Sequence, residues 1–169
     1  MAEPVLPFLK NGVSQIAQVV EDLDRTVAQY WTRFGVGPWD FYTYQKPLLS
    51  HQSYRGRPSD YSIRLALSWM GPTRIELIQP LRGPSVHADF VRAHGYGVQH
   101  LGIVVTDREA ALGQARAAGI QVIMDGGGFG LDGDGYYAYL DTESLLGVML
   151  ELIQRPQRRR PPEKVYPAP

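Results

Sequence analysis

The sequence contains no cysteine among its 169 residues. Disulfide-stabilised scaffolds, zinc sites built from thiolates and cysteine nucleophiles are therefore excluded. Any bound metal would have to be held by His, Asp, Glu, Asn or Gln, whose nitrogen and oxygen atoms suit hard or borderline divalent ions.

The chain also lacks an excess of charge and a long apolar segment. Lys plus Arg and Asp plus Glu number 17 each, so the composition gives no reason to expect nucleic acid or an anionic membrane as a partner. No run approaches the ~20 apolar residues of a membrane span. The first ten residues include Glu3 and two prolines and lack the basic start and apolar run of a signal peptide. We therefore predict a soluble, cytoplasmic protein.

What the sequence does contain is an internal repeat. Residues 76–79 read Glu-Leu-Ile-Gln and recur at 151–154, and residues 13–22 resemble residues 98–107. Two matches in the same order indicate a tandem duplication, with ten more residues in the first copy. Hydrophobic residues make up 44% of the chain, as in a folded domain, so we expect two small halves that share a core.

Both copies have the same expected order of elements, namely a strand, a helix and three strands, or βαβββ. Apolar β-rich runs begin the copies, and Asp22 or Asp24 in the first and Asp107 in the second can cap the helix that follows. The strands are expected at residues 13–20, 39–44, 61–70 and 74–79, and again at 98–105, 121–124, 136–141 and 148–153. We predict an α+β fold of two such modules.

The module boundaries follow from this pattern. The first module covers residues 1–80, a linker with a short helix covers 81–97, and the second module covers 98–155. A basic, proline-rich tail covers 156–169, and the last 16 residues hold five prolines, four arginines and Lys164. This composition has little to bury, so we interpret it as a solvated tail, with contact to a partner subunit or a nucleic-acid arm as alternatives.

Four polar residues interrupt the apolar strands at equivalent places in the repeat. Gln15 corresponds to His100, and Glu76 corresponds to Glu151. A lone carboxylate in such apolar surroundings costs several kcal/mol to bury unless it is paired or bound to a metal. Taken singly, each residue could lie on the exposed face of an edge strand or form hydrogen bonds inside the core. Together they predict a site for one divalent ion such as Zn, Ni, Co, Mn or Fe(II).

With these residues the chain resembles the vicinal oxygen chelate superfamily over residues 11–155. That superfamily includes glyoxalase I, methylmalonyl-CoA epimerase, extradiol dioxygenases and bleomycin-resistance proteins. Residues 83–100 look most like the epimerase branch, whereas the ligand order Gln, Glu, His, Glu looks most like eukaryotic-type glyoxalase I. The resemblance implies a cup-shaped mixed sheet with Gln15, Glu76, His100 and Glu151 as metal ligands.

The resemblance also implies an activity. We expect a divalent-metal-dependent isomerase or lyase that acts on a small molecule by proton transfer through a metal-stabilised enolate. Glu151 is the first candidate for the base, and Glu76 is the second. A metal-free binding protein of the resistance type and an Fe(II) extradiol-type dioxygenase are the alternatives. Homodimers are common in the family, so a homodimer is expected by analogy.

Substrate contacts are expected from two further groups of residues. The extra residues of the first copy, about 45–60, contain His51 and Arg55, which suit a loop that recognises a carboxylate or phosphate; a plain surface loop is the equal alternative. Trp39 and Trp69 suggest an aromatic pocket, although aromatic residues in strands more often belong to the core. The glycine-rich residues 125–135 are interpreted as a mobile lid between strands.

Overall fold

The computed structural model describes residues 6–168, and a single 11-stranded mixed sheet runs through it. The predicted α+β class and the repeated βαβββ units are confirmed. Residues 1–5 of the expected first module and Pro169 of the expected tail lie outside the described residues. No helix in the described part of the chain has the length and apolar character needed to cross a membrane.

The centre of the sheet shows the duplication directly. Strands β1 (Gln15–Val19) and β7 (Gly97–Val104) lie side by side and antiparallel. Each has the last strand of its own copy as a parallel neighbour, β6 (Thr73–Arg82) for β1 and β10 (Met149–Gln154) for β7. Outward from these, β5 (Ser62–Met70) and β2 (Trp39–Tyr44) match β9 (Gly135–Leu140) and β8 (Val122–Phe129).

Two helices cover the outer faces of the two halves. Helix α1 (Leu23–Phe34) begins where the Asp22 carboxylate accepts a hydrogen bond from the backbone of Arg25, and it ends at Gly35 in the left-handed conformation. Helix α3 (Arg108–Ala117) is capped in the same way by Asp107. Of the two caps expected for the first helix, Asp22 is therefore the one in place. Each helix packs its apolar side on the sheet of its own copy.

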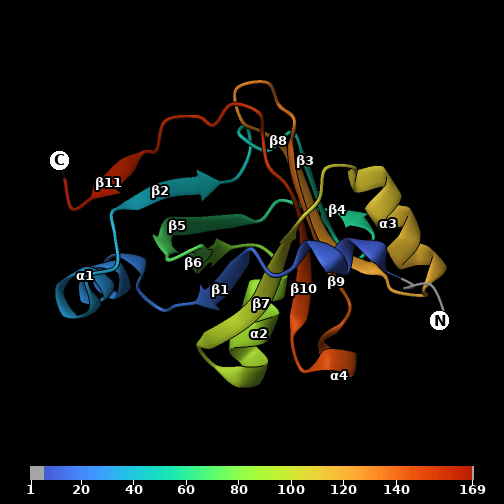
Figure 1. Ribbon diagram of the computed structural model, residues 1–169, viewed down its shortest axis with the longest axis horizontal. Coiled ribbons are helices and arrows are strands. Elements are labelled where there is room, and N and C mark those ends of the chain that lie inside the picture. Colours follow the sequence, from blue (N-terminus) through green and yellow to red (C-terminus); the bar gives the residue numbers. More distant parts are fainter. Residues whose placement is uncertain (1–5, 169) are drawn as a thin grey trace.

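The inner faces of both halves form one shared core. The sheet curls so that β2, β5 and β6 face β8, β9 and β10 (Figure 1). Buried side chains from both copies, such as Tyr44, Leu65 and Tyr137, belong to one cluster, and Val86 of α2 (Val86–His94) joins it. The two modules therefore bury apolar surface against each other.

Two segments within the modules fold differently from expectation. Residues 45–60 contain β3 (His51–Tyr54) and β4 (Arg57–Pro58), a hairpin that pairs with β8 of the other copy. The expected glycine-rich lid is largely strand, because β8 continues to Phe129 and its backbone groups pair with both β3 and β9. Only the turn at residues 130–134 remains between β8 and β9.

The end of the C-terminal tail packs against the first module of the same chain. Strand β11 (Lys164–Tyr166) pairs with β2, which would otherwise expose the backbone groups of a sheet edge. The Glu163 carboxylate accepts hydrogen bonds from the backbone and the hydroxyl of Thr43. The interpretation of this segment as a solvated tail is therefore wrong for residues 163–166, which bond to β2. The remaining short helices are η1 (Pro7–Asn11) and α4 (Glu143–Leu146).

Candidate metal centre

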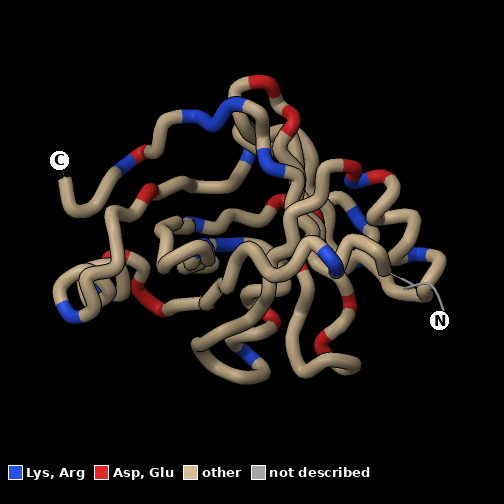
Figure 2. The backbone as a smooth tube through the Cα atoms, viewed as in Figure 1, with Lys and Arg blue, Asp and Glu red and all other residues tan. Residues whose placement is uncertain are grey.

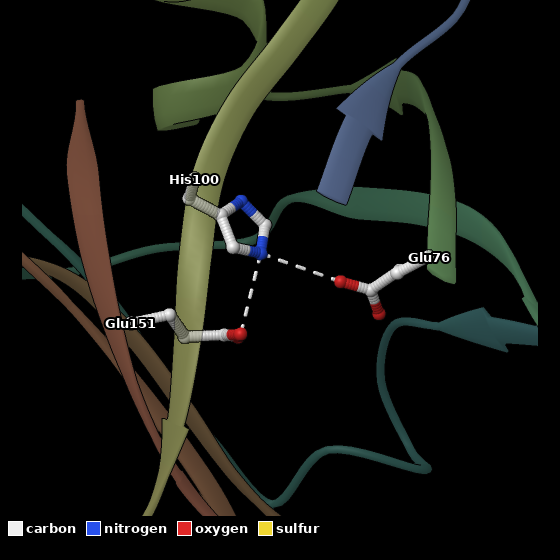
Figure 3. Close-up of side chains that lie close together, drawn as sticks. All are labelled: Glu76, His100 and Glu151. Carbon is white, nitrogen blue, oxygen red and sulfur yellow. Dashed lines mark ion pairs between the residues drawn. The ribbon is translucent and has the colours of Figure 1, made fainter. Parts of the chain in front are cut away.

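Three of the four predicted ligands meet on the concave side of the sheet. Glu76 of β6, His100 of β7 and Glu151 of β10 are all buried, and their candidate donor atoms lie within 4.8 Å of one another. The His100 Nε2 atom lies 3.2 Å from Glu151 Oε2 and 3.4 Å from Glu76 Oε2. Figure 3 shows the imidazole and both carboxylates turned toward a common point.

The register of the central strands brings these side chains together. Residue 17 of β1 lies opposite both Glu76 and His100, and Gly102 of β7 lies opposite both Gln15 and Glu151. Because side chains alternate along a strand, all four polar groups point to the same face. The Gln15 amide completes the group, since its Nε2 donates to Glu76 Oε2 at 2.9 Å and to Glu151 Oε2 at 3.2 Å.

Gly102, which has no side chain, leaves room for this arrangement. A Cβ atom on Gly102 would lie 2.9 Å from the Gln15 Cβ, 2.7 Å from the Ile153 Cδ1 and 3.3 Å from Glu151 Oε2. The first two distances are shorter than normal carbon contacts. Glycine at this position therefore allows the side chains of Gln15 and Glu151 to meet over β7.

The donor set fits a divalent cation. The buried His100 Nε2 makes no well-aligned hydrogen bond, although two carboxylate oxygens lie close to it. On the other side of the ring, Nδ1 lies 2.6 Å from the Gln99 Oε1. An amide oxygen only accepts, so Nδ1–H is the donor, and in the neutral ring the lone pair of Nε2 faces Glu76 and Glu151. One imidazole and two carboxylates, with the Gln15 amide oxygen after rotation of that amide, are ligands that zinc and similar ions prefer.

Without a cation the cluster retains a proton. Burial alone would lower the pKa of His100, but the negative charges of Glu151 and Glu76, whose oxygens lie close to Nε2, outweigh it and raise that pKa to about 9. Burial raises the pKa of the Glu151 carboxyl, and the nearby Glu76 charge acts in the same direction. A divalent ion would replace the proton and neutralise the paired carboxylates.

The predicted substrate residues are mostly placed elsewhere. Trp39 is fully buried under α1 on the outer face, and its Nε1 donates to the Val36 carbonyl. His51 lies on β3 and contacts Asp125 at 2.9 Å, and Arg55 pairs with Asp89 of α2 at 3.1 Å. The structure does not bring these three side chains to the cluster. Trp39 lies on the outer face of the sheet, and the hairpin that carries His51 and Arg55 pairs with β8 instead of closing over the cup.

Trp69 lies nearer to the mouth of the cup. It is half-exposed at the end of β5, and its ring faces the Arg74 guanidinium at 4.5 Å from the ring centre. Arg74 itself lies two residues before Glu76 on the same face of β6. Burial lowers the pKa of Arg74 to about 10, and the positive charges of Arg159 and Arg155 add to this effect.

The cup contains two adjoining hollows. The inner hollow, of about 40 Å³, lies over Gln15, Glu76 and Glu151. The outer hollow, of about 380 Å³, shares four of its lining residues with the inner one, and these are Tyr44, Phe129, Pro156 and Arg159. Residues of the C-terminal segment thus form part of the wall next to the cluster, a role that their basic, proline-rich composition did not indicate.

Comparison with known proteins agrees with this architecture. A family model described as the glyoxalase/bleomycin resistance protein/dioxygenase superfamily matches residues 14–139. No curated protein matches the chain.

Solved structures of similar fold include both characterised and uncharacterised proteins. A hypothetical protein from Bacillus halodurans is 20% identical, with a TM-score of 0.59 over 88% of this chain and 97% of that one. Methylmalonyl-CoA epimerase from Mycobacterium tuberculosis is 24% identical, with a TM-score of 0.58 over 85% and 87% of the two chains. A variant of the Streptomyces coelicolor methylmalonyl-CoA epimerase, in complex with 2-nitronate-propionyl-CoA, is 22% identical, with a TM-score of 0.62 over 89% and 98%.

Proposed function

The chain belongs to the glyoxalase/bleomycin resistance protein/dioxygenase superfamily, and from this premise we propose that it is a divalent-metal-dependent isomerase or lyase. The reaction is proton transfer at a carbon next to a carbonyl group, in the manner of methylmalonyl-CoA epimerase or glyoxalase I. The observation that carries the proposal is the buried group of Glu76, His100 and Glu151, whose donor atoms converge.

The metal would be held by Glu76, His100 and Glu151 together with Gln15. When bound, a divalent cation supplies a Lewis acid that stabilises negative charge on a substrate oxygen. The Gln99 contact fixes the ring of His100 so that Nε2 remains directed at the cluster.

Glu151 is the best placed group to take the proton. In the protein without a bound ion, burial raises the pKa of the Glu151 carboxyl. Glu151 would therefore act as the base when it detaches from the ion, because a buried carboxylate is a stronger base than an exposed one. The inner hollow lies directly against this side chain and is walled by apolar and aromatic groups such as Leu67 and Tyr137. Glu76 lies on the other side of the Gln15 amide and is the second candidate.

The donor set favours proton transfer over the dioxygenase alternative. Iron(II) oxygenases of the facial-triad type hold the metal with two histidines and one carboxylate. Among the described residues, His100 supplies the single imidazole of the cluster, and Gln15 stands where a second histidine would be needed.

The proposal is tested by proton exchange. The full-length protein, supplied with Zn, Ni, Co, Mn or Fe(II), is incubated in deuterated buffer with methylmalonyl-CoA or with the thiohemiacetal of methylglyoxal and glutathione. We expect deuterium incorporation or product formation that stops with chelator and falls by at least ~100-fold in Glu151→Gln.

Glu143→Gln is the matched control, because Glu143 also pairs with a histidine, His94, but on the surface. Equal activity of Glu151→Gln and the unmodified protein would contradict the proposal. Ligand binding that persists without metal and in Glu76→Gln would instead support a metal-free binding protein.

Two expectations from the sequence analysis stay predictions. A homodimer is tested by light scattering of the purified protein, and a cytoplasmic location is tested by fractionation of the source cells.

A further inference from the structure

Three arginines gather beside the metal cluster without carboxylate partners. Arg74 lies on β6, Arg155 follows β10 directly, and Arg159 belongs to the C-terminal segment. Figure 2 shows Lys and Arg residues along that segment, where it passes above β2. In the part of the chain that the structure describes, none of the three forms an ion pair, whereas Arg158 in the same segment pairs with Asp132.

The three arginines line two hollows beside the metal cluster. Arg155 and Arg159 line the inner hollow together with Glu76 and Glu151. Arg159 and Arg74 line a neighbouring side hollow of about 160 Å³, together with Trp69 and one carboxylate residue, Asp40. Arg159 therefore connects the arginine group to the metal cluster.

Two of the guanidinium groups lie over the ring of Trp69. Its ring centre lies 4.5 Å from the Arg74 Cζ and 5.9 Å from the Arg155 Cζ. Cation–π contacts of this kind orient the guanidinium plane but leave its N–H groups free to donate elsewhere. The Arg74 Nε is buried and donates to no group in the structure. Like charges held close together with unused donors are stabilised when an anion binds between them.

We propose that Arg74, Arg155 and Arg159 form a subsite for an anionic group of the substrate, a carboxylate or a phosphate. The inference deepens the proposed function, since it assigns an anionic substrate whose reacting carbon lies at the metal cluster. Trp69 is a positioning residue of this subsite, and the outer hollow takes the remainder of the molecule. The C-terminal segment, through Arg155 and Arg159, is then part of the substrate site.

The test measures anion binding independently of metal and activity. Inorganic phosphate and succinate are titrated into the full-length protein in the presence of chelator, and binding is followed by calorimetry. We expect at least one of them to bind more tightly than about 10 mM, and Arg159→Gln to weaken that binding by about tenfold or more. Tighter binding of phosphate or of succinate shows which anionic group the subsite prefers.

Arg158→Gln is the matched control, because it removes the same charge from the same segment. Arg74→Gln serves as a second variant, and thermal unfolding of each variant checks that the fold is intact. The proposal is overturned if neither anion binds, if Arg159→Gln and Arg74→Gln both bind as the unmodified protein does, or if Arg158→Gln weakens binding equally. Such a result, with deuterium exchange still dependent on metal and Glu151, would remove the subsite and leave the proposed function in place.

Discussion

Single residues around the candidate metal centre differ in how directly they would act on the ion. Gln99 contacts no carboxylate of the cluster, yet its amide oxygen accepts the Nδ1–H of His100 and so sets which ring nitrogen faces Glu76 and Glu151. Contacts of this kind fix the tautomer and the orientation of a histidine ligand. The geometry of the cluster therefore depends on a residue that supplies none of its donors.

Replacing Gln99 tests this dependence. We expect Gln99→Leu to lower the affinity for a divalent ion by about 10–100-fold, because the imidazole loses the acceptor that orients it. The unfolding temperature measured without metal shows whether the fold is preserved. An affinity equal to that of the unmodified protein would mean that packing alone orients the ring.

Proton release on metal binding is a second prediction at this scale. The folded, metal-free protein holds the His100 pKa at about 9, so at pH 7 the ring is protonated and must lose its proton to bind a cation. We expect release of at least one proton per ion at pH 7, and an apparent affinity that rises about tenfold per pH unit up to about pH 9. Calorimetry in buffers of different ionisation enthalpy measures the proton count, and a count of zero contradicts the prediction.

The sequence carried strong signals for some residues and none for others. Gln15, Glu76, His100 and Glu151 stand out because each interrupts an apolar strand at a position that the repeat duplicates. Arg159 has no such signal, since its proximity to Glu76 and Glu151 depends on how the tail folds back across the cup. The structure brings the four repeat-equivalent residues together, and their role as ligands stays a prediction.

Among the elements, β7 lies between the strands that carry Gln15 and Glu151, so a side chain on β7 could push these two residues apart. Gly102 leaves space between them. We expect Gly102→Ala to move Gln15 outward and to weaken metal binding, measured by competition with a chromogenic chelator. Gly113→Ala is the control: its Cβ would meet nothing within 4 Å, and it lies inside α3, where alanine stabilises a helix by about 1 kcal/mol relative to glycine. Equal metal affinity of both variants would contradict the account.

Local signals located most of the main strands and the two long helices. Asp22 and Asp107 cap their helices as the pattern of residues indicated, and β2 occupies the expected residues 39–44. The hairpin of β3 and β4 and the strand β11 could not be predicted in this way. Each is stabilised by pairing with a strand far away in the sequence, β8 or β2, and short strands carry little periodicity of their own.

At the scale of the whole molecule, the two copies depend on each other. The central pair of the sheet joins β1 to β7, and the inner core combines side chains of both halves. We expect a single cooperative unfolding transition for the full chain, and no cooperative transition for residues 1–80 or 81–169 expressed separately. Circular dichroism with thermal unfolding measures both, and a folded fragment would show that the modules are independent.

The measurement that tests the account most directly is the metal content of the purified full-length protein, determined by mass spectrometry after reconstitution with divalent ions. The account predicts about one ion per chain, retained in Glu143→Gln and lost in Glu151→Gln. Absence of a bound ion from the unmodified protein, or equal metal content in Glu151→Gln, would contradict the assignment of Gln15, Glu76, His100 and Glu151 as a metal centre.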